Sequence, residues 1–421
     1  MVKINIPTEV ENIISGLMSE GYDAYAVGGC VRDSIIGEIP NDWDICTSAT
    51  TDEMKKHFEK CKMKTVDTGI RHGTVTVIGE NGGTYEVTTF RVDGEYTDNR
   101  HPDSVRFVKT VEEDLSRRDF TVNAMAYNSD GLVDPFGGQE DLANGLIRCV
   151  GDPNLRFNED ALRILRAFRF AAVYDFKIDK NTEEAIHKCK DKLKNISGER
   201  LREELCKFIC GDGAMRLLLE YEDVIGEIVP ELFARTVGYK TAANSIAEYD
   251  GFELSVKIAL LLSEIEPGEN NSVISSILDR LKFSTKIKNE ITELIANKDR
   301  EIKETIPTVL QMLREFGEEG TRRLVLFQFA RDKVVSSRCK AGGHFTRVGN
   351  LMWEALTKNY CYTLKDLALS GEELIAAGIK SGVVIGRVLD HLLDTVISGE
   401  LQNRRELLLA EAVSYAKTIS E

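Results

Sequence analysis

Strand-forming patterns in this 421-residue chain stop near Gly137, and helical periodicity alone continues to the C-terminus. Before that point, short β-rich runs alternate with amphipathic segments. After it, apolar residues recur at helical spacing, as in Ala161–Val173, Leu201–Ile209, Val256–Leu262 and Ile385–Ile397. A chain that uses both element types and then only helices predicts an α+β domain followed by all-helical domains. The length indicates two to four domains of about 150 residues each.

The first part of the chain has a readable order of elements, predicted from apolar spacing, alternation and turn residues. In chain order they are a helix through Val10–Leu17, a strand at Tyr22–Val27, a helix at Val31–Ile36, and strands at Asp42–Cys46, Thr74–Ile78 and Tyr85–Arg91. Asn81, Gly82 and Gly83 predict a hairpin between the last two strands. Thr51 is expected to cap a further helix, and the polar segment Asp93–Asp103 is expected to be a mobile loop.

Composition excludes several classes of protein. The net charge of −15 argues against a protein that coats nucleic acid non-specifically, although local basic surfaces are compatible with it. The nine cysteines contain no C-x-x-C and the six histidines no H-x-x-x-H, so neither a disulfide framework nor a histidine-built zinc site is expected. No apolar run reaches membrane-spanning length. The N-terminus lacks the layout of a secretory signal, so a cytoplasmic location is expected.

Two glycines, Gly28 and Gly29, lie between a predicted strand and a predicted helix and are followed by Arg32. Glycines at such a junction let the backbone approach a phosphate closely. An arginine in the first helical turn can add charge-assisted hydrogen bonds to a triphosphate. A tight turn without a ligand is the alternative interpretation, and the two aspartates that follow argue against it.

Asp42 and Asp44 form a D-x-D pattern, whose side chains would project from one face of the predicted strand. Two carboxylates so close repel each other, and a divalent cation relieves the repulsion. Oxygen ligands without histidine favour Mg²⁺ over zinc. Glu86 is a candidate third carboxylate for two-metal phosphoryl transfer. The alternatives are a solvated strand edge for the D-x-D pattern and an ion pair between Glu86 and Arg91.

Arg117, Arg118 and Asp119 come between the predicted loop and the helical region. Taken alone, this pattern is usual for a cluster of ion pairs on a surface. In this position its arginines could face a nucleotide, and Asp119 could accept a hydrogen bond from a ribose hydroxyl.

The segment Glu159–Arg169 has an unusual concentration of arginine for a helix. Polar residues step by three along it and predict one stripe, formed by Asp160, Arg163, Arg166 and Arg169. A carboxylate offers a hydrogen-bond acceptor, and a guanidinium beside it offers a planar set of donors. This pair matches the exocyclic amine and ring nitrogen of cytosine and adenine, and mismatches uracil and guanine. Asp160 and Arg163 therefore predict a base-reading pair. An ion pair between them on an exposed helix is the alternative.

Together these motifs resemble class II nucleotidyltransferases, the bacterial CCA-adding tRNA nucleotidyltransferases and the bacterial poly(A) polymerases. The resemblance follows chain order through residues 28–204. Its motifs are G-G-x-V-R-D from Gly28, D-x-D from Asp42, T-G-x-x-H-G-T-V-T from Thr68, E-V-T-T-F-R from Glu86, D-G-x-Y-x-D-x-R-H-P from Asp93, R-R-D-F-T-x-N-A from Arg117, D-P-F-G-G from Asp134, E-D-x-x-R from Glu159 and G-E-R-x-x-E-E from Gly198.

The resemblance implies a seahorse-like molecule. Its head would be an α+β nucleotidyltransferase domain with a mixed β-sheet, followed by all-α neck, body and tail. We expect the head at residues 1–137, the neck with the base-recognition helix at 138–210, the body at 211–330 and the tRNA-binding tail at 331–421.

The resemblance also implies an activity, the template-independent addition of C, C and A to the 3′ end of tRNA from CTP and ATP with release of pyrophosphate. Two Mg²⁺ ions would be bound by Asp42 and Asp44, with Glu86 as the third carboxylate. The residues implied to contact the nucleotide are Gly29, Arg32, Arg118, Asp119, Asp160, Arg163, Arg166 and Arg169.

The loop at Asp93–Pro102 favours A addition, because relatives that add only C and C tend to lack it. An enzyme that adds the terminal A alone and a poly(A) polymerase are the alternatives within the resemblance. A non-catalytic module that binds RNA or nucleotides is a more distant alternative.

The segment Thr321–Arg347 has seven Lys or Arg against one acid, Asp332, within an acidic chain. Contact with the phosphates of the tRNA acceptor and TΨC arm requires such a surface, and the binding should weaken with salt. A solvated helix face is the alternative. The candidate tRNA-binding residues are Arg322, Arg323, Arg331, Lys333, Arg338 and Lys340.

Overall fold

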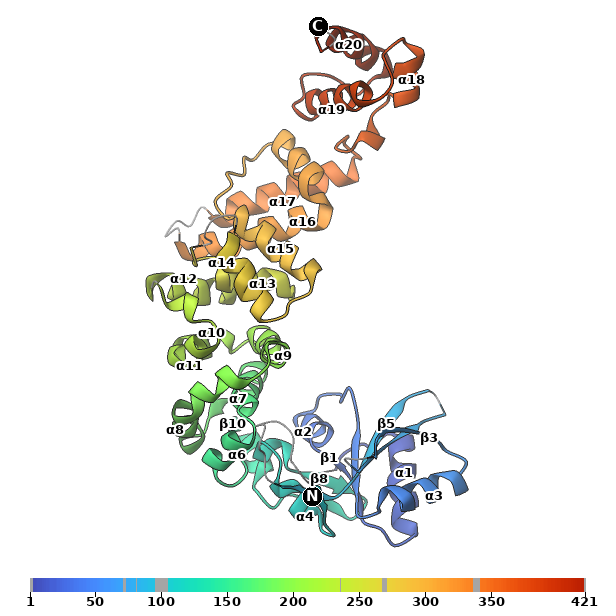
Figure 1. Ribbon diagram of the computed structural model, residues 1–421, viewed down its shortest axis with the longest axis vertical. Helices are drawn as coiled ribbons and strands as arrows, with labels where there is room; N and C mark the ends of the chain where they lie inside the picture. Colours follow the sequence, from blue (N-terminus) through green and yellow to red (C-terminus); the bar gives the residue numbers. More distant parts are fainter. Residues whose placement is uncertain are drawn as a thin grey trace. The chain divides into compact units, whose positions relative to one another are not determined.

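The computed structural model describes residues 3–70, 73–80, 82–94, 105–234, 236–266, 271–335 and 341–419 (Figure 1). The chain divides into two compact units, Met1–Glu231 with Arg280–Lys282, and Leu232–Asp279 with Phe283–Glu421. Within the described ranges, no helix is long and apolar enough to cross a membrane. The predicted limits of head, neck, body and tail stay a prediction; the one at residue 330 falls inside helix α16 (Ile306–Val335).

The first unit contains a seven-stranded mixed sheet in the order β3-β4-β5-β2-β1-β8-β9. Strands β2 and β5 are parallel, and the other neighbours are antiparallel. The strands are β1 (Ala24–Val27), β2 (Asp44–Thr47), β3 (Lys64–Gly69), β4 (Thr74–Ile78), β5 (Thr84–Thr89), β8 (Ala126–Asn128) and β9 (Gly131–Val133). All strands that the sequence predicted are present, and β3 is one that it did not predict.

Helices α1 (Thr8–Ser19), α2 (Gly29–Ile36) and α3 (Thr51–Lys60) complete this sheet domain, and α1 and α3 contact each other and the sheet. Two predicted details are wrong. The cap of α3 is Thr50, whose side chain and that of Glu53 form a capping box, while Thr51 is the first helical residue. Strand β2 begins at Asp44, because the chain still bends at Asn41.

A short hairpin of β6 (Arg91–Asp93) and β7 (Val105–Phe107) flanks the predicted mobile loop. Most of that loop, residues 95–104, lies outside the described residues. Helix α4 (Val111–Ser116) and the 3₁₀ helix η2 (Thr121–Asn123) follow. Apolar residues of β1, α4 and β8, including Val27, Leu115 and Ala126, pack around buried Phe90 to form a core beside the sheet.

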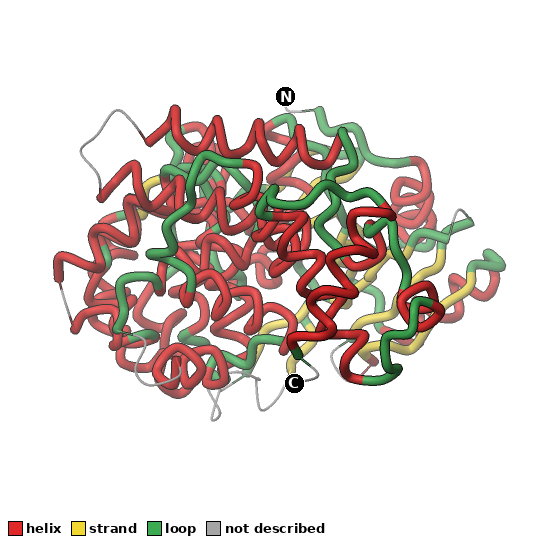
Figure 2. Tube along the Cα trace, turned by 90° about the horizontal axis from the view of Figure 1, so that it is seen from above, coloured by secondary structure: helices red, strands yellow, loops and turns green. Residues whose placement is uncertain are grey.

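After the sheet domain the first unit is helical, as predicted, except for one parallel pair of two-residue strands, β10 (Leu146–Ile147) and β11 (Lys177–Ile178). All the described strands, drawn in yellow in Figure 2, belong to the first unit. The helices are α5 (Gly138–Ala143), α6 (Pro153–Glu159), α7 (Leu162–Val173), α8 (Lys180–Cys189), η3 (Lys190–Asn195), α9 (Gly198–Ile209), α10 (Ala214–Glu220) and α11 (Glu222–Ile228).

The described residues of the second unit form helices and connecting loops. Helix α13 (Leu254–Leu262) is buried from Val256 onwards and contacts α12, α15 and α16, so it is central to the packing of this unit. Helix α16 is kinked at Gly317, whose φ is 68°. The others are η4 (Pro230–Ala234), α12 (Thr236–Ala247), α14 (Ser272–Arg280), α15 (Thr285–Ala296), α17 (Ala341–Thr357), η6 (Leu364–Asp366), α18 (Gly371–Ala376), α19 (Val383–Ile397) and α20 (Arg405–Thr418).

Candidate active site

Two of the three predicted metal-binding carboxylates lie side by side on the sheet. Asp44 begins β2, and Glu86 is its register partner on the parallel strand β5. Paired residues of neighbouring strands point to the same face, and the strands are about 4.8 Å apart. Asp42 lies two residues earlier, in the segment before β2, and its side chain is exposed. Strand pairing therefore unites Asp44 and Glu86, whereas the loop determines where Asp42 lies.

Negative charges gather around Asp44, which is exposed at the start of β2. Desolvation by the surrounding protein raises its pKa first, the charges of Asp42 and Glu86 raise it further, and Arg118 acts in the opposite direction. A cavity of about 190 Å³ lies beside these groups. Its walls are Val27, Asp44, Ile45, Cys46, Thr74, Glu86, Thr88, Arg91, Asp114, Arg117 and Arg118.

The donor set fits a hard divalent cation, because it consists of mutually repelling carboxylates without histidine or thiolate. In the described part of the chain, however, no three Asp, Glu, His or Cys side chains converge closely enough to chelate an ion by themselves. A metal ion held by Asp42, Asp44 and Glu86 would therefore need further oxygen ligands, such as phosphate oxygens or water.

The predicted glycine turn is present at the start of α2. Gly28 has φ of 82°, and a Cβ built there would lie 2.9 Å from the Arg118 guanidinium, so this position favours glycine on both counts. Arg118, which follows helix α4, lies against this turn. Its Nη2 lies 3.3 Å from Asp114, and its buried Nε has no hydrogen-bond partner among the described residues.

Arg32 is buried within the protein, with 7% of its surface exposed. Its guanidinium donates to Asp33 at 2.8 Å and to the side-chain oxygen of Asn123. It also lies 5.1 Å from the ring centroid of Phe170 and 5.0 Å from that of Tyr174. Arg32 thus joins α2 to α7, a role that its position in the motif did not reveal.

Asp114 is a site residue that sequence reasoning missed. Its fully buried carboxylate accepts hydrogen bonds from Arg117 and Arg118 and from the backbone N–H of Arg91. Burial alone would raise the pKa of Asp114, but the two guanidinium groups outweigh it, and the pKa is lowered. The available signal was the helical spacing of Asp114 to the two arginines that follow.

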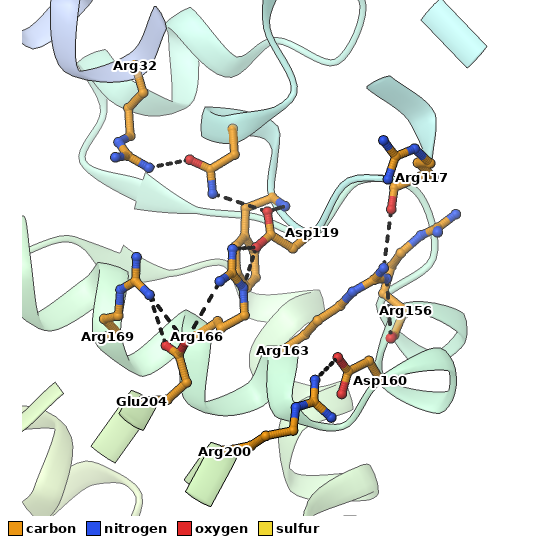
Figure 3. A network of polar contacts seen from close by, with 12 residues as sticks. Arg32, Arg117, Asp119, Arg156, Asp160, Arg163, Arg166, Arg169, Arg200 and Glu204 are labelled. Atoms are coloured by element: carbon orange, nitrogen blue, oxygen red, sulfur yellow. Dashed lines mark hydrogen bonds and ion pairs between the residues drawn. The ribbon is translucent and has the colours of Figure 1, made fainter. Parts of the chain in front are cut away.

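Asp119 is held by the protein itself. Its Oδ2 accepts hydrogen bonds from Arg166 Nε and Nη2, at 2.8 and 2.6 Å, and its Oδ1 accepts one from Asn123 at 3.1 Å (Figure 3). Burial raises the pKa of Asp119, but Arg166 and Asn123 reverse this effect and lower it to about 2. Asp119 is therefore a carboxylate that connects the segment before η2 to α7.

The predicted polar stripe has to be corrected, because Asp160 is not on the same helix as the three arginines. It follows the end of α6, with φ of −146°, and α7 begins at Leu162. Its Oδ1 accepts a hydrogen bond from the backbone N–H of Leu162, and its Oδ2 accepts one from Arg200 Nη2 at 2.6 Å. The helix break turns Asp160 towards α9 (Figure 3).

Arg163 lies close to Asp160 in the chain but has other partners. Its Nη1 donates to Glu159 at 2.6 Å, and its Nη2 donates to the backbone carbonyl of Arg117 at 3.2 Å. The alternative of an ion pair between Asp160 and Arg163 is not seen, because each group is held by a different neighbour. Arg200, in the G-E-R-x-x-E-E motif, and Glu159 are two further residues for which the sequence predicted no role.

The last two arginines of the stripe converge on one carboxylate. Arg169 donates to both oxygens of Glu204 at 3.2 Å, and Arg166 Nη1 lies 3.8 Å from the same side chain. Glu204 comes from α9 and is buried. The three arginines of α7 therefore lie against carboxylates of this chain (Figure 3).

The predicted tRNA-binding residues belong to the second unit, and those that are described take part in ion pairs. Arg338 and Lys340 lie outside the described residues. The pairs are Arg322 with Glu253 and Glu319, Arg323 with Glu253 and Glu290, Arg331 with Glu264 and Asp299, and Lys333 with Glu248. Their role towards tRNA stays a prediction.

Three family models match successive parts of the chain. The poly A polymerase head domain matches residues 24–148, and the RNA and SrmB-binding site of polymerase A matches residues 175–234. The tRNA nucleotidyltransferase domain 2 matches residues 255–412. The first match includes the carboxylates and the glycine turn, and the second includes Arg200 and Glu204.

Curated relatives and solved structures match over almost the whole length. The chain is 34% identical to the CCA-adding enzyme of Ligilactobacillus salivarius, over 98% of each sequence, and 35% identical to that of Limosilactobacillus reuteri, over 96% of each. The CCA-adding enzyme of Bacillus stearothermophilus, solved in complex with CTP, matches with a TM-score of 0.77, 31% identity and 98% coverage of both chains. The Thermotoga maritima enzyme, solved with tRNA, shares the fold with a TM-score of 0.64.

Proposed function

The chain belongs to the CCA-adding enzyme family, and on this premise we propose how its own residues perform the reaction. It adds C, C and A to the 3′ end of tRNA from CTP and ATP, without a nucleic acid template and with release of pyrophosphate. The observation that carries the proposal is the pairing of Asp44 with Glu86 on parallel strands, beside a cavity that Arg118 also lines.

The family implies the use of a divalent metal, and we propose two Mg²⁺ ions bound through Asp42 and Asp44, with Glu86 as the third carboxylate. Such ions, when bound, lower the pKa of an attacking hydroxyl and stabilise the leaving pyrophosphate. The raised pKa of Asp44 supports the proposal, because a nearby cation would relieve the repulsion that the three carboxylates now share.

The triphosphate and the sugar of the nucleotide are proposed to contact four residues, Gly29, Arg32, Arg118 and Asp119. Arg118 has the strongest support, because its buried Nε has no described partner and its guanidinium lies beside the glycine turn at Gly28. For Arg32 and Asp119, the contacts to Asn123 and Arg166 fix their orientation before a nucleotide binds.

Base selection is proposed for Asp160 and Arg163, with Arg166 and Arg169 beside them. A carboxylate acceptor and a guanidinium donor match the donor and acceptor edges of cytosine and adenine. Arg200 orients Asp160, and Glu159 holds Arg163. We expect Asp160→Ala to weaken the preference of the enzyme for CTP over UTP.

We further propose that the tRNA acceptor and TΨC arm contacts the basic segment of the second unit, and that the enzyme acts in the cytoplasm, where tRNA is used. Head, neck, body and tail would occupy residues 1–137, 138–210, 211–330 and 331–421. The described Arg and Lys side chains of this segment already have acidic partners, so tRNA phosphates would have to compete with those carboxylates. The binding of tRNA should therefore weaken as the salt concentration increases.

The experiment that tests the proposal is extension of a tRNA that lacks its three 3′ nucleotides, resolved to single nucleotides. Two additions with CTP alone and a third only when ATP is added would establish CCA synthesis. One A added only to tRNA that already ends in C-C would identify an A-adding enzyme, and long A tails on unstructured RNA would identify a poly(A) polymerase.

The controls are two aspartate substitutions of the same kind. Asp42→Ala should abolish incorporation, because it removes a metal ligand. Asp52→Ala, at an exposed position in the first turn of α3, should leave incorporation unchanged. Equal activity of both variants would disprove the assignment of Asp42, even if CCA synthesis itself is observed.

A further inference from the structure

Cys61, at the end of α3, differs from the other described cysteines in its exposure. Its side chain reaches solvent, whereas Cys206 and Cys210 are half-buried and the rest are buried. Burial also raises the pKa of Cys30, Cys149 and Cys206 to about 12, which makes their thiols unreactive near neutral pH. An exposed thiol is a condition for chemistry at cysteine, although exposure by itself is not sufficient.

The second observation is a buried histidine beside this thiol. His57 lies one helical turn before Cys61, only 4% of its surface is exposed, and its Nε2 is 3.8 Å from Cys61 Sγ. The ring is fixed by close packing, since a Cβ built on Gly16 of α1 would lie 2.8 Å from the same Nε2. A buried imidazole is therefore held in position against an exposed sulfur.

A carboxylate lies close to the opposite side of the imidazole, although the buried His57 Nδ1 makes no hydrogen bond of good geometry among the described residues. Glu20, at the end of α1, has Oε1 3.3 Å from His57 Nδ1 and 2.8 Å from Lys60 Nζ. Lys60 and then His57 lower the pKa of Glu20, so it is ionised near neutral pH. The Glu20 carboxylate thus lies on the side of the ring away from the thiol and is paired with Lys60.

We propose that Cys61, His57 and Glu20 form a reactive thiol site that undergoes exchange with low-molecular-weight disulfides. A base within reach activates a nucleophile, and a negative charge close to the base favours its protonated form. His57 Nε2 accepts the Sγ–H proton while Glu20 stabilises the resulting imidazolium. The Cys61 thiolate attacks one sulfur of the disulfide, forming a new S–S bond and breaking the old one. The released thiolate takes up the proton and leaves as a thiol.

The test measures the reaction of the full-length chain with 4,4′-dithiodipyridine, with peptide mapping to assign the modified cysteine. The reference is the same thiol in the urea-unfolded chain, because mere exposure cannot make a folded thiol faster than an unfolded one. We expect Cys61 in the folded protein to exceed this reference by at least about tenfold near pH 7, because an ordinary thiol with a pKa of about 8.5 is only a few per cent ionised there. Mapping also separates Cys61 from Cys339, which lies outside the described residues.

Substitutions then distinguish activation from accessibility. His57→Gln should return the rate at Cys61 to the unfolded reference, and Glu20→Gln, which leaves the buried ring in place, should lower it partially. Glu11→Gln, at an exposed glutamate on the same helix α1, is the matched control and should have no effect. If the folded rate does not exceed the unfolded reference, or if Glu20→Gln and Glu11→Gln behave alike in folded protein, the proposal is wrong.

Discussion

Each arginine on α7 lies against a carboxylate that comes from another element. The partners are Glu159 of α6 for Arg163, Asp119 for Arg166, and Glu204 of α9 for Arg169. Three guanidinium groups on consecutive turns would repel one another without these anions. The protein therefore holds the proposed base-reading surface in place with its own charges, and a nucleotide that binds there would meet side chains that are already oriented.

Asp119 makes this arrangement sensitive to acid. Its pKa in the folded protein, about 2, is below the usual value in an unfolded chain, about 3.9. The stabilisation is fully present above the unfolded value and is lost as pH falls through the folded one, and it amounts to about 2 kcal/mol. We expect urea unfolding to show that the stability difference between wild type and Asp119→Asn shrinks as pH falls from about 5 towards about 2.

A matched substitution separates this effect from general acid instability. Asp52→Asn changes an exposed aspartate outside the proposed site. The difference in unfolding free energy between this variant and wild type should be nearly constant over the same pH range. A constant difference for Asp119→Asn as well would mean that Arg166 does not stabilise its charged form.

At the scale of elements, local signals determine where helices α2, α3 and α7 begin. Helix α3 begins with a capping box, in which Thr50 and Glu53 bond to each other's backbone and side chain. Helix α2 begins directly after Gly28, and α7 begins after the break that contains Asp160. At the starts of α2 and α7 these signals position Gly28 beside Arg118 and Asp160 beside Arg200, residues that are far apart in the chain.

The cap of α3 gives a direct comparison of two adjacent threonines. Thr50→Ala should destabilise the protein by about 1 kcal/mol, because it leaves a helical N–H without an acceptor. Thr51→Ala should be nearly neutral, because Thr51 is already within the first turn. Thermal unfolding of both variants checks the assignment, and a larger loss for Thr51→Ala would contradict it.

Close packing of α7 gives a second prediction at this scale. A Cβ built on Gly211 would lie 2.6 Å from the backbone carbonyl carbon of Ala172 and 2.7 Å from the nitrogen of Val173. Backbone atoms cannot give way as a flexible side chain can, so Gly211→Ala should cost about 1–3 kcal/mol of unfolding free energy. It should also lower activity by moving the helices that carry the arginines.

A glycine-to-alanine substitution in α19 should instead increase the free energy of unfolding. Gly386 is exposed within that helix, and a Cβ built there meets nothing within 4 Å. Gly386→Ala should therefore stabilise the second unit by about 0.5–1 kcal/mol, since alanine loses less backbone entropy in a helix. Denaturant titration of the two variants measures both effects, and equal signs would refute the packing argument.

At the scale of the whole molecule, the proposed nucleotide site and the predicted tRNA-binding residues belong to different units. Carboxylates, glycine turn and α7 are all in the first unit, and the basic segment of α16 and α17 is in the second. Multi-domain chains often unfold in more than one step. The division predicts that a small ligand of the first unit stabilises that unit selectively.

We expect CTP with Mg²⁺ to protect the first unit from hydrogen exchange more than the second. At a CTP concentration of about 100 times Kd, the stabilisation is about 2.7 kcal/mol for the unit that binds. Asp160→Ala should remove most of this effect, while Gly386→Ala should preserve it. Equal protection of both units by CTP would show that they unfold as one cooperative body.

The order of the predicted elements and the family followed from the sequence, whereas the roles of the site residues stay a prediction. Apolar periodicity revealed α7, α9, α13 and α19, and turn residues revealed the β4–β5 hairpin, because both signals depend on neighbours a few positions apart. Strand β3 was not predicted, because its six residues lack a comparable pattern. The predicted Asp42–Cys46 strand was too long by its first two residues, for the bend before it is a feature of the loop.

Only the tertiary structure decided which charges meet. The register of β2 on β5 brings Asp44 beside Glu86, and the packing of α9 on α7 supplies Glu204 and Arg200. Such contacts join residues far apart in the chain, so no local spacing encodes them. The break before α7 likewise moved Asp160 out of the predicted stripe and gave it Arg200 as a partner. Sequence therefore determined the chemistry that is present, and packing determined its geometry.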